Sequence, residues 1–184
     1  MHTQTIATIC GSLRKESLNR AIINTLPELA PEGMTFFDVP SFGDFPIYNT
    51  DFQNSDGFPA AVTAFGDAIR SADGVIIVSP EYNYSIPGGL KNAIDWASRL
   101  SEQPIAGKPF ALQSAAAGML GGARMQYHLR QAIGSLEGNV FTKPEVFVTF
   151  GNKKVENGKL IDEAVRDVIS SQLAAFATFV ARFQ

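Results

Sequence analysis

The stretch Thr5-Ile-Ala-Thr-Ile-Cys-Gly-Ser-Leu-Arg-Lys-Glu-Ser-Leu-Asn19 decides the fold. Its first six residues are a short run rich in β-branched and apolar side chains, which predicts a buried β-strand. Gly11 then lets the chain turn sharply out of the strand. Apolar residues at helical spacing predict a helix over residues 19–29. A strand, a short polar loop and a helix in this order are typical of an α/β fold.

The rest of the chain repeats this alternation. Further strands are expected at 35–38, 74–79, 109–114 and 145–150, and further helices at 60–71, 87–100, 123–134 and 162–183. Five strands that alternate with five helices imply one parallel sheet covered on both faces. Because crossover connections are right-handed, we expect a three-layer, flavodoxin-like fold with strand order 2-1-3-4-5. Residues 1–184 are expected to form one domain, with a loop at 40–56 and a surface turn at 152–158.

Composition excludes several classes of protein. The chain has 184 residues, of which 45% are hydrophobic and 18% charged, which indicates a globular domain with a core. Its net charge of −3 lacks the basic excess of a nucleic-acid binder. No apolar run reaches the roughly 20 residues of a membrane span. We expect neither nucleic acid nor a membrane as a partner.

The cysteine and histidine counts set the redox context. The single cysteine excludes an internal disulfide. One cysteine and two distant histidines, His2 and His128, argue against a zinc or iron–sulfur centre. The first six residues lack the features of a signal peptide. We therefore expect a cytoplasmic protein.

The loop after the first strand has the properties of an anion site. Ser12, Ser17 and Asn19 are short polar residues at a helix start. Backbone N–H groups there lack partners, and the helix end carries partial positive charge. Arg14 adds a guanidinium suited to phosphate. The alternative is a simple helix cap, with Arg14 and Lys15 in solvent.

Three other phosphate-binding patterns do not fit this loop. The sequence has neither G-x-x-x-x-G-K-[ST] for a nucleoside triphosphate nor G-x-G-x-x-G for a dinucleotide. A low-molecular-weight tyrosine phosphatase needs an arginine six residues after its cysteine. Glu16 occupies that position after Cys10 and would repel phosphate. Cys10 is therefore interpreted as a buried strand residue.

Two further loops follow the third and fourth strands. With this strand order, ligands bind beyond the carboxyl ends of the strands, at the switch point. In the loop over 79–87, prolines stiffen the chain, and Tyr82 and Tyr84 supply flat apolar surface. Small residues over 114–124 let a ligand approach the backbone closely. Taken alone, each stretch is also compatible with an ordinary connection.

Three motifs carry a resemblance to a known family. Gly11-Ser-Leu-Arg-x-x-Ser-x-Asn19 and Ser79-Pro-Glu-Tyr-Asn-Tyr-Ser-x-Pro-Gly-Gly-Leu-Lys-Asn-Ala-Ile-Asp-Trp96 resemble the NAD(P)H-dependent FMN reductases. Gly121-Gly-Ala-Arg-x-Gln-Tyr-His-Leu-Arg130 is similar to the bacterial quinone reductases of that family, which are also described as chromate reductases. The likeness covers essentially the whole chain. It implies a flavodoxin-like fold, tightly bound FMN and self-association to a dimer or tetramer.

The resemblance also implies roles for individual residues. The phosphate of FMN would be held by Ser12, Arg14, Ser17 and Asn19, with Gly11, Leu13 and Leu18 completing the loop. The isoalloxazine would be bordered by Pro80, Glu81, Tyr82 and Asn83, with Tyr84 beside them, and approached from the third loop by Ser114 and Gly118. Subunit contacts would involve Lys91, Asn92 and Asp95, and contacts between dimers Arg124, Tyr127 and Glu145.

The implied activity is hydride transfer from NADH or NADPH to bound FMN, followed by two-electron reduction of a quinone. Chromate and other metal oxyanions are further acceptors. Glu81 is expected to position the flavin rather than transfer a proton, and His128 to be structural. Arg99, Arg124 and Lys108 are candidates for contact with the 2′-phosphate of NADPH.

Three alternatives stay open at this point. A non-enzymatic electron carrier would usually be more acidic than a net charge of −3. A regulatory module that senses redox state through flavin is the second. An azo or nitro reductase of the same architecture is the third, since fold alone does not fix the acceptor.

Overall fold

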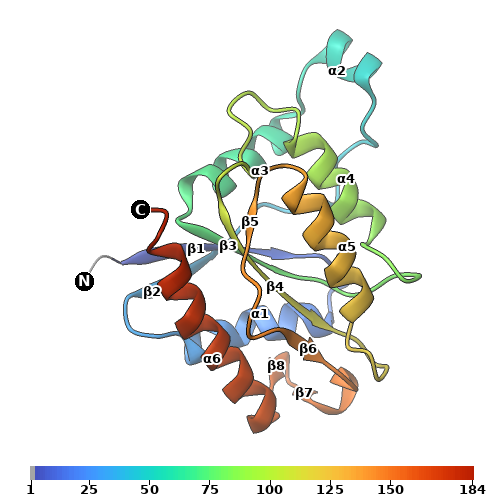
Figure 1. Cartoon of the computed structure of the whole chain (residues 1–184). Coiled ribbons are helices and arrows are strands. Elements are labelled where there is room, and N and C mark those ends of the chain that lie inside the picture. The colour runs from blue at the N-terminus through green and yellow to red at the C-terminus, as the bar shows by residue number, and fades with distance from the viewer. Residues whose placement is uncertain (1–2) are drawn as a thin grey trace.

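The computed structural model describes residues 3–184 and has the expected α/β architecture (Figure 1). Met1 and His2 lie outside the described residues. The main-sheet strands are β1 (Gln4–Cys10), β2 (Met34–Asp38), β3 (Gly74–Val78), β4 (Pro109–Ala115), β5 (Asn139–Val140) and β6 (Val146–Val148). The helices are α1 (Leu18–Leu29), α2 (Thr50–Asp56), α3 (Ala60–Ser71), α4 (Gly88–Ala97), α5 (Ala123–Gly134) and α6 (Glu163–Val180).

The strand order is β2-β1-β3-β4-β5, as predicted, and every pairing in this sheet is parallel. Helices α3, α4 and α5 cover one face, while α1 and α6 cover the other (Figure 1). β3 is buried along its whole length because both of its faces lie under helices. The carboxyl ends of β1, β3 and β4 consequently lie side by side at one edge of the sheet.

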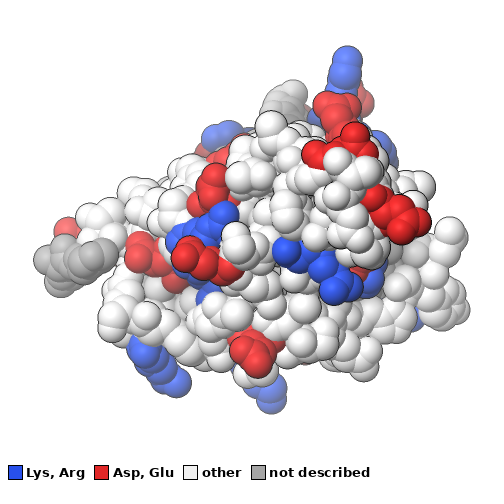
Figure 2. All heavy atoms as spheres, turned by 90° about the horizontal axis from the view of Figure 1, so that it is seen from above, with Lys and Arg blue, Asp and Glu red and all other residues white. Residues whose placement is uncertain are grey.

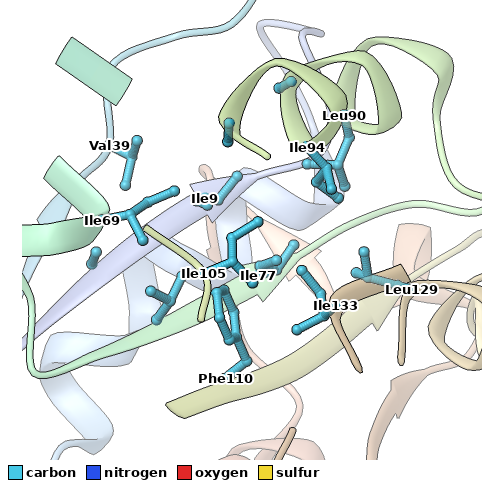
Figure 3. Close-up of a cluster of buried hydrophobic side chains, with 14 of the residues drawn as sticks. Ile9, Val39, Ile69, Ile77, Leu90, Ile94, Ile105, Phe110, Leu129 and Ile133 are labelled. Atoms are coloured by element: carbon cyan, nitrogen blue, oxygen red, sulfur yellow. The ribbon is translucent and has the colours of Figure 1, made fainter. Parts of the chain in front are cut away.

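The core on the α3–α5 face is continuous. Ile9, Ile77 and Phe110 extend from the sheet toward Leu90 and Ile94 of α4 (Figure 3). On the same face, α5 contributes residues 129 and 133, and α3 contributes residue 69. Each of these side chains is at most 4% exposed, so deletion of a large one would cost roughly 2–5 kcal/mol of folding free energy. This core holds α4 and α5 in fixed positions on the sheet.

The strand expected at 145–150 is β6, and the structure adds a two-residue strand, β5, ahead of it. β5 pairs with the start of β4 and β6 with its end. Pro144 lies between them, and because proline has no backbone N–H it cannot continue a ladder of hydrogen bonds. The two-residue β5 is too short to show a periodicity in the sequence.

Two further elements lie in segments expected to be irregular. The loop predicted over 40–56 contains α2, which has no buried residue and projects from the end of the molecule beyond α4, with the Phe52 ring edge-on to Trp96 (Figure 1). The turn predicted over 152–158 contains a 3₁₀ turn (Gly151–Lys153) and the first strand of a hairpin, β7 (Val155–Glu156) with β8 (Lys159–Leu160). Its tip is Asn157-Gly158, both with positive φ, the usual pair for a two-residue hairpin turn.

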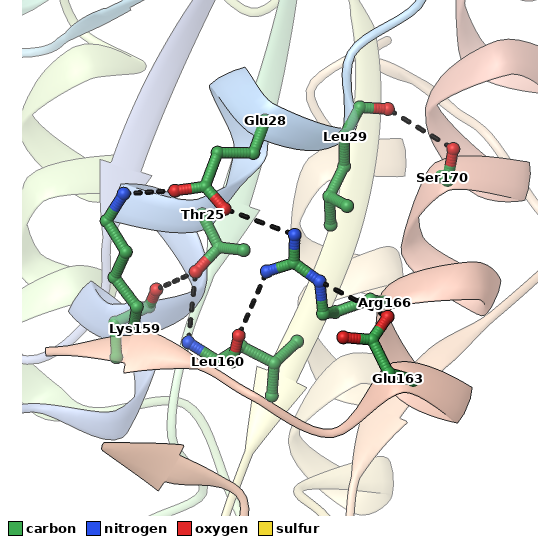
Figure 4. A network of polar contacts seen from close by, with 9 residues as sticks. Thr25, Glu28, Leu29, Lys159, Leu160, Glu163, Arg166 and Ser170 are labelled. Atoms are coloured by element: carbon green, nitrogen blue, oxygen red, sulfur yellow. Dashed lines mark hydrogen bonds and ion pairs between the residues drawn. The ribbon is translucent and has the colours of Figure 1, made fainter. Parts of the chain in front are cut away.

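A polar network fastens this hairpin to α1 and α6 (Figure 4). Glu28 of α1 forms ion pairs with Lys159 of β8 and, at 3.1 Å, with Arg166 of α6. Thr25 Oγ1 accepts a hydrogen bond from the Leu160 N–H at 3.0 Å. The C-terminal part of the chain is therefore tied to the helix that follows the first loop.

This network predicts a pH dependence of stability. The hydrogen bonds from Lys159 and Arg166 hold the pKa of Glu28 below its usual 4.5. A carboxyl whose pKa is lower in the folded state stabilises the protein above its unfolded pKa, and that stabilisation is lost as pH falls through the folded pKa. In Glu28→Gln, the free energy of unfolding should fall less steeply below about pH 4.5 than in the wild type.

Denaturant unfolding at a series of pH values measures this effect. Glu32→Gln, a change at an exposed carboxylate close by, is the matched control and should follow the wild type. Identical pH profiles for Glu28→Gln and the wild type would contradict the role given to the network.

Within residues 3–184, none of the helices is long and apolar enough to cross a membrane. Nor does that part of the chain bring together three or more His, Cys, Asp or Glu side chains in a way that could hold a metal ion.

Candidate active site

The ends of β1 and β3 touch at Gly11 and Ser79. A β-carbon placed on Gly11 would lie 2.2 Å from Ser79 Oγ and 2.5 Å from Ser79 Cβ. Gly11 does not have a positive φ. Glycine is needed at position 11 because the ends of β1 and β3 approach each other closely, not because of the sharp turn predicted from the sequence.

The first loop combines a helix cap with free donors. Ser17 Oγ caps α1, accepting from the N–H groups of Asn19 at 3.2 Å and Arg20 at 3.4 Å. Within residues 3–184, no hydrogen bond is made by the backbone N–H groups of Leu13, Lys15, Glu16 and Leu18. The helix cap considered as the alternative is therefore present, together with unpaired donors at a helix N-terminus.

Arg14 and Asn19 differ in their availability to a ligand. Arg14 is exposed, and the only hydrogen bond of its guanidinium within the described chain goes from Nη2 to the Glu16 carbonyl at 3.1 Å. The buried Asn19 amide has one partner at each polar atom: Nδ2 donates to the Ala115 carbonyl at 3.2 Å, and Oδ1 accepts from the Ala115 N–H at 2.9 Å. Asn19 thus ties the first loop to the end of β4.

The loop after β3 ends in a strained turn. Tyr82 and Ser85 exchange two backbone hydrogen bonds of 3.0 Å. The two residues between them, Asn83 and Tyr84, have φ values of 47° and 70°. Asn tolerates a left-handed conformation, but for Tyr84 it is unfavourable, so contacts outside the turn help to hold that residue.

Those contacts come from α5. Arg124 Nε donates to Glu81 Oε1 at 2.6 Å, and its guanidinium carbon lies 3.5 Å from the centre of the Tyr84 ring. The Glu81 carboxylate raises the pKa of Arg124. His128 Nδ1 lies 2.9 Å from Ser85 Oγ, in keeping with the structural role expected for it.

In the third loop, the residues that face the site are alanines at 115–117, and Ser114 is not among them. Ser114 is fully buried; its hydroxyl donates to the Gly121 carbonyl at 2.6 Å and accepts from Gln126 Nε2 at 2.8 Å. It anchors the far end of the loop. Gly118 is exposed, and a β-carbon there would meet no atom within 4 Å.

The three loops enclose a small cleft, here called the inner cleft. Its volume is about 180 Å³, and it is lined by residues 12, 14, 17–19, 80–82 and 115–117. The structure therefore brings most of the predicted first- and second-loop residues together, without Ser114 and Gly118. The sequence analysis did not name the alanines at 115–117. Three small residues directly after a strand were the signal that could have identified them as cleft residues.

Two larger cavities adjoin the first loop. The α4 cavity, about 310 Å³, is lined by residues 11, 13, 14, 42, 82 and 87–90. The β2 cavity, about 420 Å³, is lined by residues 9, 10, 12–15, 20 and 38–42. Arg14 lines all three spaces, and Tyr82 lines both the inner cleft and the α4 cavity. Cys10 is buried, as predicted.

Arg99, Arg124 and Lys108, the basic residues expected near a 2′-phosphate, lie on different parts of the fold. Lys108 precedes β4 and donates to the Arg70 carbonyl at 3.1 Å, at the opposite end of the sheet from the inner cleft. That part of the prediction is wrong. Arg99 lies over the Tyr48 ring at 5.3 Å.

The predicted subunit-contact residues of α4 also have partners within the chain. Lys91 pairs with Asp95 at 2.7 Å. Asn92 accepts from the Tyr48 N–H at 2.8 Å and donates to the Pro46 carbonyl at 2.9 Å. These contacts hold the segment that leads to α2.

Comparisons with known proteins identify the family of this chain. The family model described as NADPH-dependent FMN reductase matches residues 4–153. A quinone reductase of Escherichia coli K12 is 50% identical over 179 residues, covering 96% of this chain and 95% of the relative. An NAD(P)H-dependent FMN reductase of Pseudomonas aeruginosa is 44% identical over 177 residues, covering 96% and 95%.

A solved structure shares the fold over nearly the whole chain. The flavoenzyme FerB, an NAD(P)H:(acceptor) oxidoreductase from Paracoccus denitrificans, is 32% identical and superimposes with a TM-score of 0.87 over 98% of both chains. The fold, the three loops and these relatives agree. The chain belongs to the NADPH-dependent FMN reductase family.

Proposed function

We propose that this protein binds FMN with its phosphate at the inner cleft, takes hydride from NADH or NADPH and reduces quinones. The observation that carries the proposal is the row of unpaired N–H groups at the start of α1, beside the Ser12 hydroxyl and Arg14. Such a cradle suits the phosphate of a mononucleotide. Family membership and quinone-reducing relatives support the same ligand and acceptor class.

The protein's own residues would bind and orient the cofactor. Residues 12–18 would hold the phosphate through N–H and hydroxyl donors, and the alanines at 115–117 would let the flavin approach the backbone. Pro80, Glu81 and Tyr82 would border the ring system. FMN, when bound, supplies the redox chemistry, so no acid–base pair of the protein is required.

Glu81 has a positioning role in this proposal. Its carboxylate is engaged by Arg124 Nε at 2.6 Å and by the Met125 N–H at 3.3 Å. These bonds leave it poorly placed to exchange protons and well placed to fix the turn at 82–85. Its backbone N–H makes no hydrogen bond in the described chain and is available to a flavin carbonyl.

Quinones are the principal acceptors in this proposal, with chromate and other metal oxyanions as further ones.

We propose self-association to a dimer or tetramer, in which Tyr127, 52% exposed, would contact another copy. Arg124, expected at the same contact, is held by Glu81 of its own chain. A cytoplasmic location suits an enzyme that uses NAD(P)H and has one free thiol.

The surface charge gives little support to the alternative of an electron carrier. On the face seen in Figure 2, acidic and basic side chains are interspersed rather than gathered by sign. A strongly acidic docking face would be expected of a carrier. The azoreductase structures that share the fold are only 18% identical to this chain and show the fold alone.

Purification and steady-state kinetics test the proposal. The protein should be yellow, carry FMN, and oxidise NADH or NADPH rapidly when a quinone is present. Both nicotinamides should be tried against a panel of quinones, free FMN, chromate, an azo dye and a nitro compound. A colourless protein that binds no FMN would overturn the proposed function.

A further inference from the structure

The β2 cavity lies outside the cleft assigned to FMN and is the largest of the three spaces around the first loop. It opens between that loop and the carboxyl end of β2. It shares Leu13, Arg14 and Phe42 with the α4 cavity, which in turn shares Arg14 and Tyr82 with the inner cleft. The three spaces thus follow one another around the first loop.

The charges around the β2 cavity favour an anion. Arg20 and Asp38 neutralise each other through two hydrogen bonds of 2.7 and 2.8 Å. Asp38 also accepts from Thr8 Oγ1 at 2.7 Å. Arg14 is assigned to the FMN phosphate. Lys15 forms no ion pair within the described chain, so it is the cation that remains for a second anion at this space.

The lining of the cavity is mixed. Polar and charged side chains contribute much of it, and Ile9, Val39 and Phe42, each at most 9% exposed, contribute apolar atoms beside them. A ligand that carries both a ring and a phosphate suits such a lining. A nucleoside phosphate has this chemistry.

The position in the sheet agrees with a dinucleotide that reaches the flavin. Asp38 is the last residue of β2, and β2 is separated from β3 by β1 alone. Neighbouring strands lie about 4.8 Å apart, so the ends of β2 and β3 are about 10 Å apart. A co-substrate bound with one end at β2 can therefore reach the neighbouring inner cleft with its other end.

We propose that the β2 cavity binds the phosphate-bearing adenosine end of the nicotinamide co-substrate, with Lys15 contacting a phosphate. The nicotinamide end would then extend through the α4 cavity toward the inner cleft. The proposal rests on the proposed function, because it needs a co-substrate that donates hydride to bound FMN. It adds a binding site and a specificity residue for that co-substrate.

A charge series at Lys15 tests the site in the FMN-loaded protein. Lys15→Ala should raise the KM of the reduced nicotinamide nucleotide about tenfold, the scale of one hydrogen bond to a charged group. Lys15→Glu should raise it further, and Lys15→Arg should stay near the wild type. Because the backbone N–H of Lys15 belongs to the loop that would hold the FMN phosphate, the FMN content of each variant is measured and the KM values are compared at saturating FMN. Lys153→Ala, at an exposed lysine that does not line the cavity, is the matched control.

A comparison of NADH with NADPH distinguishes which phosphate Lys15 contacts, because only NADPH carries the 2′-phosphate. A KM effect with NADPH alone assigns Lys15 to the 2′-phosphate, and an equal effect with NADH assigns it to the pyrophosphate. No effect with either overturns the proposal while oxidation of NAD(P)H by the wild type continues. Failure of the wild type to oxidise either nucleotide would instead overturn the proposed function.

A binding measurement supports the kinetics without depending on turnover. Adenosine 2′,5′-bisphosphate, titrated into the FMN-loaded protein by calorimetry, should bind the wild type and bind Lys15→Glu at least tenfold more weakly. It should not release FMN, because the β2 cavity and the inner cleft are different spaces. Equal binding to both variants, or release of FMN, would contradict the assignment.

Discussion

Gly11→Ala should lower the free energy of unfolding by about 3 kcal/mol, the upper part of the usual range for an overpacked core site. The added β-carbon would lie 2.2 Å from Ser79 Oγ and 2.5 Å from Ser79 Cβ. Rotation of the hydroxyl relieves only the first contact, so the ends of β1 and β3 must separate. The first and second loops would move apart with them, and FMN binding should weaken strongly.

A double-mutant cycle isolates this contact. Ser79→Gly removes both close atoms, so Gly11→Ala should cost much less in that background. Gly134→Ala is the control, because a β-carbon there meets nothing within 4 Å and alanine favours a helix. Denaturant unfolding and flavin titration measure both effects. Equal stability of Gly11→Ala and the wild type would show that the two strand ends are not packed as described.

Arg14→Ala should weaken FMN binding by about 1.5 to 3 kcal/mol, the scale of a hydrogen bond to a charged group. The guanidinium is exposed, lines the inner cleft and has one hydrogen bond, to the Glu16 carbonyl. It is therefore free to meet a phosphate. Arg14→Lys should lose part of this affinity, because an ammonium group keeps the charge without the fork of donors. Unchanged affinity in Arg14→Ala would remove Arg14 from the phosphate site.

The sheet could be predicted because its strands are short β-branched runs and the helices between them show clear periodicity. The right-handed crossover rule then left few arrangements. Helix α2 was missed because it buries no residue and so has no apolar stripe. The hairpin of β7 and β8 was also missed, although Asn157-Gly158 was a local signal for it.

At the site, sequence reasoning brought the right loops together but could not assign every side chain. Asn19 and Ser114 are polar residues next to the cleft, yet their polar groups bond to Ala115 and Gly121. Such partners are set by tertiary packing and leave no mark in the local sequence. The sequence predicted a glycine at position 11 for a sharp turn, whereas in the structure it is needed for the close approach to Ser79.

The central claim is that the first loop anchors a flavin by its monophosphate. The most direct measurement compares the dissociation constants of FMN and riboflavin on protein freed of flavin, since the two ligands differ only in the phosphate. Several charge-assisted hydrogen bonds should make FMN bind at least about a hundredfold more tightly, and Arg14→Ala should narrow that ratio while leaving riboflavin unchanged. Equal affinity for FMN and riboflavin would contradict the account.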